Sequence, residues 1–261
     1  MRGNGVVPKA VLLDLGGVLV DVVGRPWGLR EVAEEVHDLL RRSGCPLGLD
    51  RVERDVRAGW KAYQDWKSAE GRRARPREMV HREFWDELVA ADWPERARTA
   101  VGERAAALSE RIDVATKDRP VKADATETLR AVTDRGIVCA IVSNALSGAG
   151  SRRLVREQGL EPYLAAQVYS GEEGIRKPNP EIFAAAAERI GVRLTECWYV
   201  GDQIDRDILG GRRAGVGRVL LLPSGSTGTG NDAIAEPDAV ITRPSDLLDL
   251  LDLLSVRLGA R

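Results

Sequence analysis

Polar side chains with complementary chemistry stand at the ends of short apolar segments of this chain or in the loops between them: Asp14, Ser143, Asn144, Lys177, Asp202 and Asp207. Aspartates are hard oxygen ligands suited to Mg²⁺, and a carboxylate can itself attack phosphorus. A serine hydroxyl and a lysine ammonium can bind phosphoryl oxygens and offset their charge. The set therefore predicts a site for phosphoryl chemistry.

The apolar segments are predicted to be strands, at residues 9–14, 138–143, 167–170, 198–201, 218–222 and 239–242. Helices are predicted between them, at residues 125–135, 151–158, 180–190, 205–214 and 244–254. This alternation favours an α/β fold with a Rossmann-like parallel sheet covered on both faces. Open parallel sheets place their sites at the carboxyl ends of the strands, where these polar side chains stand.

A helical region interrupts this alternation after the first strand. Helices are predicted there at residues 29–42, 50–69, 76–92 and 94–112. Five of the six tryptophans lie before residue 100, and we expect them to form a core for these helices. We therefore expect residues 1–21 and 119–261 to form the α/β core domain, with residues 22–118 inserted as an all-α cap domain.

Composition narrows the classes of partner. The 261 residues include 39 Lys and Arg against 40 Asp and Glu, so no basic excess points to nucleic acid. No uncharged apolar run of about 18 residues suits a membrane span, and no secretory signal is recognisable. Three widely spaced cysteines fit a reducing compartment. We expect a cytoplasmic protein without nucleic-acid or membrane partners; oligomeric state has no signal. Residues 225–230 (GSTGTG) are predicted to be a flexible loop.

Four motifs in order resemble those of the haloacid dehalogenase superfamily, in the subgroup with a helical (C1-type) cap inserted after the first strand. They are DLGGVLVD from Asp14, VSNA from Val142, RKPNPEIF from Arg176 and GDQIDRDILGGRRAG from Gly201. The resemblance extends over nearly the whole chain. It implies a hydrolase with an α/β core, a cap that selects the substrate, and a magnesium ion.

The resemblance also implies roles for the motif residues. Asp14 is expected to be the nucleophile, and Lys177 to steady it and the phosphoryl charge. Ser143 and the backbone amide of Asn144 are expected to bind the transferring group.

Metal binding is implied for a second, overlapping set. Asp14 and Asp202 are expected to bind Mg²⁺ through their carboxylates, and Gly16 through its backbone carbonyl. Asp207 is expected to be a weaker member of the site, acting through water. Helix capping competes as an explanation for Asp205 and Asp207, which flank a predicted helix start.

Gly16 departs from the family pattern. The phosphatases usually carry an aspartate there as general acid and base, a role worth about 10²–10⁴-fold in rate. Glycine has no side chain to transfer a proton, although its carbonyl remains. We therefore expect an intact nucleophile and metal site, with proton transfer impaired or supplied by Asp21 or a substrate group.

The leading hypothesis is a Mg²⁺-dependent phosphatase of a small phosphorylated metabolite, working through an aspartyl-phosphate at Asp14. A dehalogenase- or phosphonatase-like hydrolase stays open, the latter needing a cap lysine such as Lys61 or Lys67 as a Schiff base. A third alternative is a weakly catalytic module that binds a phosphate ligand. Residues 59–67 (GWKAYQDWK) are the cap segment to examine first.

Overall fold

The structure, a computed structural model, describes residues 7–225, 227 and 235–259, with side chains up to residue 254. Its centre is a six-stranded sheet in the order β5-β4-β1-β6-β7-β8, with every neighbouring pair parallel. The strands are β1 (Ala10–Leu13), β4 (Val138–Ser143), β5 (Ala166–Tyr169), β6 (Cys197–Gly201), β7 (Arg218–Leu221) and β8 (Ala239–Val240). The predicted α/β class is confirmed. Most of the predicted loop at 225–230 lies outside the described residues.

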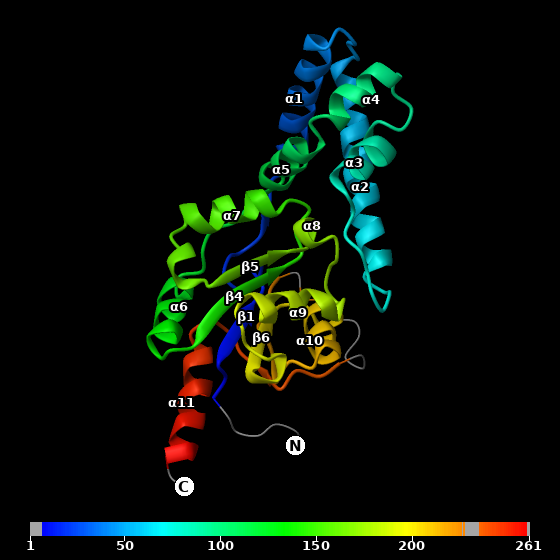
Figure 1. The fold of residues 1–261 in the computed structure, drawn as a ribbon. Coiled ribbons are helices and arrows are strands. Elements are labelled where there is room, and N and C mark those ends of the chain that lie inside the picture. Colours follow the sequence, from blue (N-terminus) through cyan, green and yellow to red (C-terminus); the bar gives the residue numbers. More distant parts are fainter. Residues whose placement is uncertain (1–6, 226, 228–234, 260–261) are drawn as a thin grey trace.

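Helices cover both faces of this sheet (Figure 1). Alternate residues of β1 belong to two separate cores, as strand geometry requires: Val11 and Leu13 pack in one, Ala10 and Leu12 in the other. The first core includes residues of α6 (Ala125–Asp134), α7 (Gly148–Glu157) and α11 (Asp246–Gly259). The second includes residues of α9 (Pro180–Arg189) and η4 (Ile204–Ile208), which leads into α10 (Leu209–Ala214). Shorter elements are α8 (Ser170–Glu173), η2 (Glu161–Tyr163) and η3 (Leu194–Glu196).

A separate helical unit lies at one end of the molecule (Figure 1). It contains α1 (Gly28–Arg42), α2 (Leu49–Glu70), α3 (His81–Glu83), η1 (Phe84–Val89), α4 (Glu95–Gly102) and α5 (Ala105–Ala115). Among the residues that the structure describes, its hydrophobic core consists of residues of this unit together with Leu146 from outside it. Where the chain enters and leaves, β2 (Val23–Gly24) pairs antiparallel with β3 (Lys117–Asp118). The domain boundaries at 21/22 and 118/119 remain a prediction that agrees with this arrangement.

Two helices of this unit differ from their predicted extents. The helix predicted over 76–92 begins only at His81, because the preceding residues are extended and Arg77 forms a β-bridge with Ile175. The helix predicted over 94–112 is divided into α4 and α5, and the break follows Gly102, a poor helix former. Pairing between distant segments overrides the local pattern in the first case.

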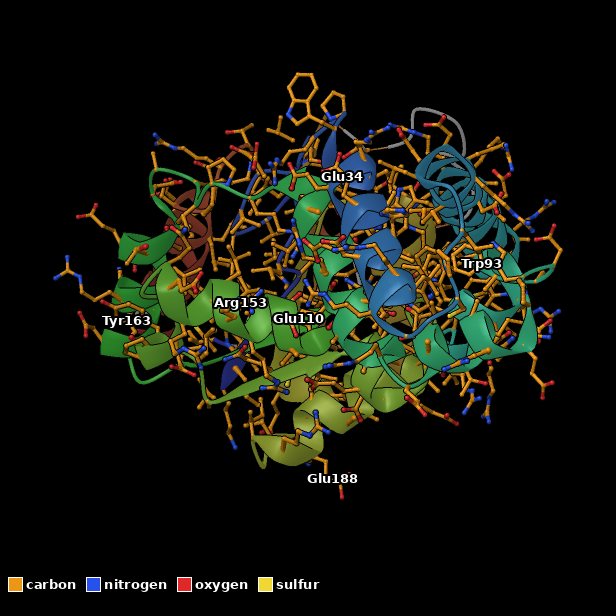
Figure 2. All side chains as sticks on the ribbon, turned by 90° about the horizontal axis from the view of Figure 1, so that it is seen from above. Glu34, Trp93, Glu110, Arg153, Tyr163 and Glu188 are labelled. Carbon is orange, nitrogen blue, oxygen red and sulfur yellow. The ribbon has the colours of Figure 1, made fainter. Side chains whose placement is uncertain are left out.

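The helical unit contacts the α/β unit at several places. An ion pair joins Glu110 of α5 to Arg153 of α7 at 2.7 Å, and both are labelled in the view from above (Figure 2). The segment before α3 makes a second contact, since the Pro76 carbonyl accepts hydrogen bonds from Arg176 N at 3.3 Å and Asn179 Nδ2 at 3.4 Å. Over the described ranges, none of the helices is long and apolar enough to cross a membrane.

Candidate active site

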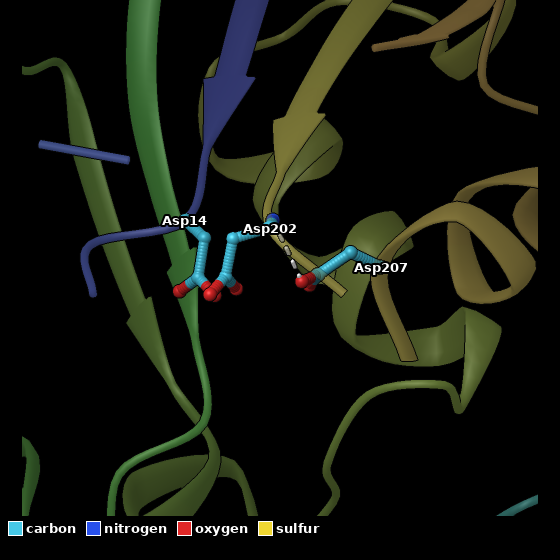
Figure 3. A group of neighbouring side chains, drawn as sticks. All are labelled: Asp14, Asp202 and Asp207. Atoms are coloured by element: carbon cyan, nitrogen blue, oxygen red, sulfur yellow. Dashed lines mark hydrogen bonds between the residues drawn. The ribbon is translucent and has the colours of Figure 1, made fainter. Parts of the chain in front are cut away.

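Three aspartates converge at the carboxyl ends of the central strands (Figure 3). Asp14 follows β1, Asp202 follows β6, and Asp207 lies in η4. One carboxylate oxygen from each lies within 4.8 Å of the other two, and all three side chains are buried. Residues that are far apart in the sequence thus form one acidic cluster, as the strand-end argument predicts.

Lys177 joins this cluster from a loop. Its Nζ lies 2.9 Å from Asp14 Oδ2 and 2.6 Å from Asp207 Oδ1, and it donates a hydrogen bond to Tyr199 Oη at 2.7 Å. The Asn144 side chain fixes the loop: its Oδ1 accepts from Lys177 N at 2.8 Å and its Nδ2 donates to the Lys177 carbonyl at 3.1 Å. Asn144 therefore positions the lysine through its side chain, a role the sequence analysis did not foresee.

Asp207 is saturated by hydrogen bonds from the protein. Its Oδ1 accepts from Tyr199 Oη at 2.8 Å, and its Oδ2 accepts from the backbone N–H groups of Asp202 at 3.2 Å and Gln203 at 2.9 Å. Burial alone would raise the pKa of Asp207, but the charges of Lys177 and Arg206 outweigh it and hold the pKa well below its usual range. The charged carboxylate thus anchors Lys177 and the turn after β6.

Arg206 is a further member that the sequence analysis missed. Its Nη2 lies 2.8 Å from Asp202 Oδ1 and 3.4 Å from Asp14 Oδ2, and its Nε lies 3.4 Å from Asp207 Oδ2. The available signal was its position four residues after Asp202 and next to Asp207. The three carboxylates therefore face two cations, Lys177 and Arg206, which leaves an acidic excess.

The pKa of Asp14 is raised by its burial in this cluster. Burial raises its pKa above the usual range, with Lys177 opposing the shift and Asp207 adding to it. Its Oδ1 accepts a hydrogen bond from Leu15 N at 2.7 Å, which fixes the carboxylate at the start of the loop. A further cation brought to the cluster, beside Lys177 and Arg206, would favour the ionised form of Asp14.

A cavity of about 220 Å³ opens beside the cluster and extends between the two units. Asp14, Gly16 and Ser143 line it on the α/β side, as does Asp202. Gly17 at φ +79° has no room for a side chain, because a Cβ there would lie 2.4 Å from Asp202 Oδ2. The loop after β1 is therefore held against the metal-ligating candidates.

The helical unit supplies the opposite wall from the segment 59–67 and its neighbours. Trp60, Tyr63 and Lys67 of α2 line the cavity. Trp60 also packs against the core of the helical unit, so it serves both purposes. Of the two lysines considered from sequence, the structure places Lys67 in the wall; Lys61 is exposed and pairs with Asp65 at 2.7 Å.

The remaining acidic candidates lie outside the cluster. Asp21 is exposed and pairs with Lys122 at 3.0 Å. Asp205 is exposed on η4 although it stands between Asp202 and Asp207 in the sequence. Neither lines the cavity beside Asp14.

Comparison with models of known protein families identifies the family of this chain. The family model for haloacid dehalogenase-like hydrolases matches residues 8–215. The chain belongs to this family. The resemblance stated from the four motifs is thereby confirmed.

Individual relatives are similar over part of their length. The chain is 35% identical to glyceraldehyde 3-phosphate phosphatase of Methanopyrus kandleri over 49% of its own length and 55% of that protein. It is 34% identical to phosphoserine phosphatase of Thermus thermophilus over 56% of its own length and 54% of that protein. The chain thus spans about half the length of these curated relatives.

Solved structures share the fold over nearly their whole length. A haloacid dehalogenase-type phosphatase from Thermococcus onnurineus matches with a TM-score of 0.59 at 20% identity, over 93% of this chain and 97% of that one. A 2-haloacid dehalogenase from Pseudomonas syringae pv. Tomato matches with a TM-score of 0.61 at 21% identity, over 94% and 99%. The fold therefore accommodates both chemistries, and the site must decide between them.

Proposed function

We propose that this chain is a Mg²⁺-dependent phosphatase of a small phosphorylated metabolite, with Asp14 as the nucleophile. The observation that carries the proposal is the buried contact of Lys177 with Asp14 at 2.9 Å, at the wall of a cavity that Ser143 also lines. A nucleophile, a fixed cation and a hydroxyl donor are what phosphoryl transfer requires. The similar proteins glyceraldehyde 3-phosphate phosphatase and phosphoserine phosphatase support the same reaction class.

The chain's own residues account for most of the reaction. A carboxylate oxygen of Asp14 forms a bond to phosphorus while the bond from phosphorus to the ester oxygen breaks. The departing oxygen takes its proton from the solvent, because Gly16 has no side chain to supply one. Lys177 offsets the added negative charge, and Ser143 donates a hydrogen bond to a phosphoryl oxygen. Water then attacks the aspartyl-phosphate, which releases inorganic phosphate and restores Asp14.

The acidic cluster fits a divalent cation. Three carboxylates against two protein cations leave a negative excess, and a phosphate dianion adds to it, so an additional cation is needed. Asp14 and Asp202, which line the cavity, would hold Mg²⁺ together with the Gly16 carbonyl. Asp207 does not line it and is held by Lys177 and by backbone donors. When bound, the ion supplies positive charge beside the phosphoryl oxygens and helps to orient the ester.

Phosphate release should depend on this ion. After treatment with EDTA and buffer exchange, we expect less than about 1% of the activity on the best substrate of a panel of phosphorylated metabolites, and recovery on adding Mg²⁺. Ca²⁺, which prefers more ligands at longer distances, should restore much less. Full activity in the chelated protein would contradict the metal assignment, and release from no member of the panel would contradict the phosphatase.

The substitution Gly16→Asp tests whether the chain lacks the general acid and base that phosphatases of the family usually carry at position 16. A Cβ at position 16 would lie 3.1 Å from Val22 Cγ2, and Val22 is 50% exposed and free to shift. We expect kcat for alkyl phosphates to rise by about 10- to 100-fold, because an alkoxide leaving group needs a proton. For p-nitrophenyl phosphate, whose leaving group needs none, we expect little change. The control is Gly24→Asp, where a Cβ meets no atom within 4 Å.

Equal gains on both esters, or none on either, would contradict this account of Gly16. The rival functions have their own signatures. A dehalogenase releases halide from 2-haloacids, and a phosphonatase leaves a borohydride-trapped adduct on Lys67. A ligand-binding module is stabilised thermally by phosphorylated compounds without turning them over.

A further inference from the structure

The wall of the cavity away from Asp14 carries more cations than carboxylates. Its cations are Lys67, Lys117, Arg119 and Arg176. Two buried carboxylates face them. Asp113 lies 3.1 Å from Lys117 and 2.6 Å from Arg119, and Glu78 lies 3.2 Å from Arg176. Four positive side chains against two negative ones leave this wall able to accept an anion.

Lys67 is the cation without a carboxylate. No Asp or Glu oxygen lies within 4 Å of its Nζ among the residues described, and its contact there is the face of the Tyr63 ring, 5.0 Å away. Burial lowers the pKa of Lys67 to about 7, and the charges of Lys117 and Arg176 contribute. An anion beside Nζ would favour the charged form of Lys67 and raise this pKa again.

Arg176 provides a second, independent sign of an absent acceptor. Its side chain is buried, and its Nη1 forms an ion pair with Glu78 Oε1 at 3.2 Å. The guanidinium carbon lies 5.7 Å from the centre of the Trp66 ring. Its Nε is buried and has no hydrogen-bond partner. A buried donor that lacks an acceptor costs free energy. Arg176 also lines the cavity, so a small turn of its guanidinium toward an incoming carboxylate or phosphate oxygen would recover that cost.

We propose that the substrate is a phosphate monoester with a second anionic group, and that Lys67 and Arg176 bind this group while the ester phosphate lies at Asp14. The inference rests on the proposed phosphatase function. One cavity connects the two sets of residues, so a single small molecule bridges them. A carboxylate and a second phosphate share this chemistry, and the substrates below distinguish them.

The test compares esters that differ only in the second group. We expect kcat/KM for 3-phosphoglycerate to exceed that for glycerol 3-phosphate, in which a hydroxymethyl group replaces the carboxylate, by about 10- to 100-fold. Propane-1,3-diol bisphosphate against its monophosphate measures the preference for a second phosphate. The pair with the larger ratio of kcat/KM values shows whether the second anion is a carboxylate or a phosphate.

Substitutions then locate the binding group. Lys67→Gln should remove most of the preference, because it should raise KM for the substrate that carries the second anion much more than KM for glycerol 3-phosphate. Lys67→Arg keeps the charge and should keep the preference. Lys61→Gln is the matched control on the same helix, since its side chain is 77% exposed and pairs with Asp65, and it should leave both substrates unchanged.

The outcomes separate this inference from the proposed function. Phosphate release at equal kcat/KM within both pairs overturns the second-anion inference and leaves the phosphatase standing. Release from no ester overturns both. If Lys67→Gln and Lys67→Arg lose activity equally on all substrates, the lysine acts as an amine in the reaction, and the inference is overturned.

Discussion

Asp14→Asn should lower kcat for phosphate release by about 10⁴-fold or more, because an amide cannot form the acyl-phosphate bond that the proposed reaction requires. The side chain is nearly isosteric, and its Oδ1 can still accept the Leu15 N–H bond at 2.7 Å. Lys177 keeps Asp207 as an ion-pair partner at 2.6 Å, so we expect the folded structure to survive. Phosphate release under saturating substrate and Mg²⁺ provides the measurement.

The matched control for this prediction is Asp205→Asn. Asp205 lies within the same motif as Asp202 and Asp207, loses the same charge, and is exposed on η4. Its substitution should change kcat by less than about twofold. The nucleophile assignment would fail if Asp14→Asn retained a tenth of the activity while its thermal unfolding matched that of the unchanged protein.

Lys177→Met should lower the free energy of unfolding more than any other single substitution considered above, and it should also abolish activity. It removes the ammonium from two buried carboxylates, those of Asp14 and Asp207. Breaking a buried ion pair by removing one partner typically costs about 3–5 kcal/mol in the free energy of unfolding, since the other charge stays buried. Denaturant unfolding of the metal-free protein measures this loss.

The sign of the pH dependence follows from the carboxylates. With Lys177 present, the pKa of Asp207 lies below its usual range, so the pair contributes stability above the ordinary aspartate pKa and loses it as the pH falls. Without the lysine, we expect burial to raise the folded-state pKa of the Asp14 and Asp207 carboxyls. The free energy of unfolding then falls as the pH rises from the ordinary aspartate pKa to this raised value. The deficit of Lys177→Met should therefore be larger at pH 8 than at pH 5.

A double variant makes this prediction specific to the ion pair. Lys177→Met with Asp207→Asn removes both charges, and it should be more stable than Lys177→Met alone even though it carries an additional substitution. Equal or lower stability of the double variant, with no dependence on pH, would show that Lys177 acts through packing.

The strand ends were predictable because their signal is local. Asp14, Ser143 and Asp202 each follow a short apolar run, and parallel strands bring their carboxyl ends to one edge. The alternation of strands and helices likewise gives the class of the sheet and the place of the insertion. Each of these inferences needs only neighbouring residues and a general rule of topology.

The rest of the site depends on contacts that no local pattern encodes. Glu78 meets Arg176 across 98 positions of sequence. The neighbouring β-bridge of Arg77 with Ile175 delays the start of the helix predicted over 76–92 to His81. Lys67 and Lys61 are both lysines of one helix, and only the three-dimensional arrangement turns one of them to the cavity. Arg206 resembles a surface arginine in a charged motif until the two strands bring Asp14 and Asp202 to it.

The contact between the segment before α3 and the loop carrying Lys177 has a mechanical consequence. Pro76 and Glu78 contact Arg176 and Asn179, which lie on either side of Lys177. The insertion is therefore fastened here, as well as at the Glu110–Arg153 ion pair and at its two chain connections. A rigid swing of the helices would either break these bonds or pull on the loop. The position of Lys177 is therefore tied by direct contact to the position of the helical unit.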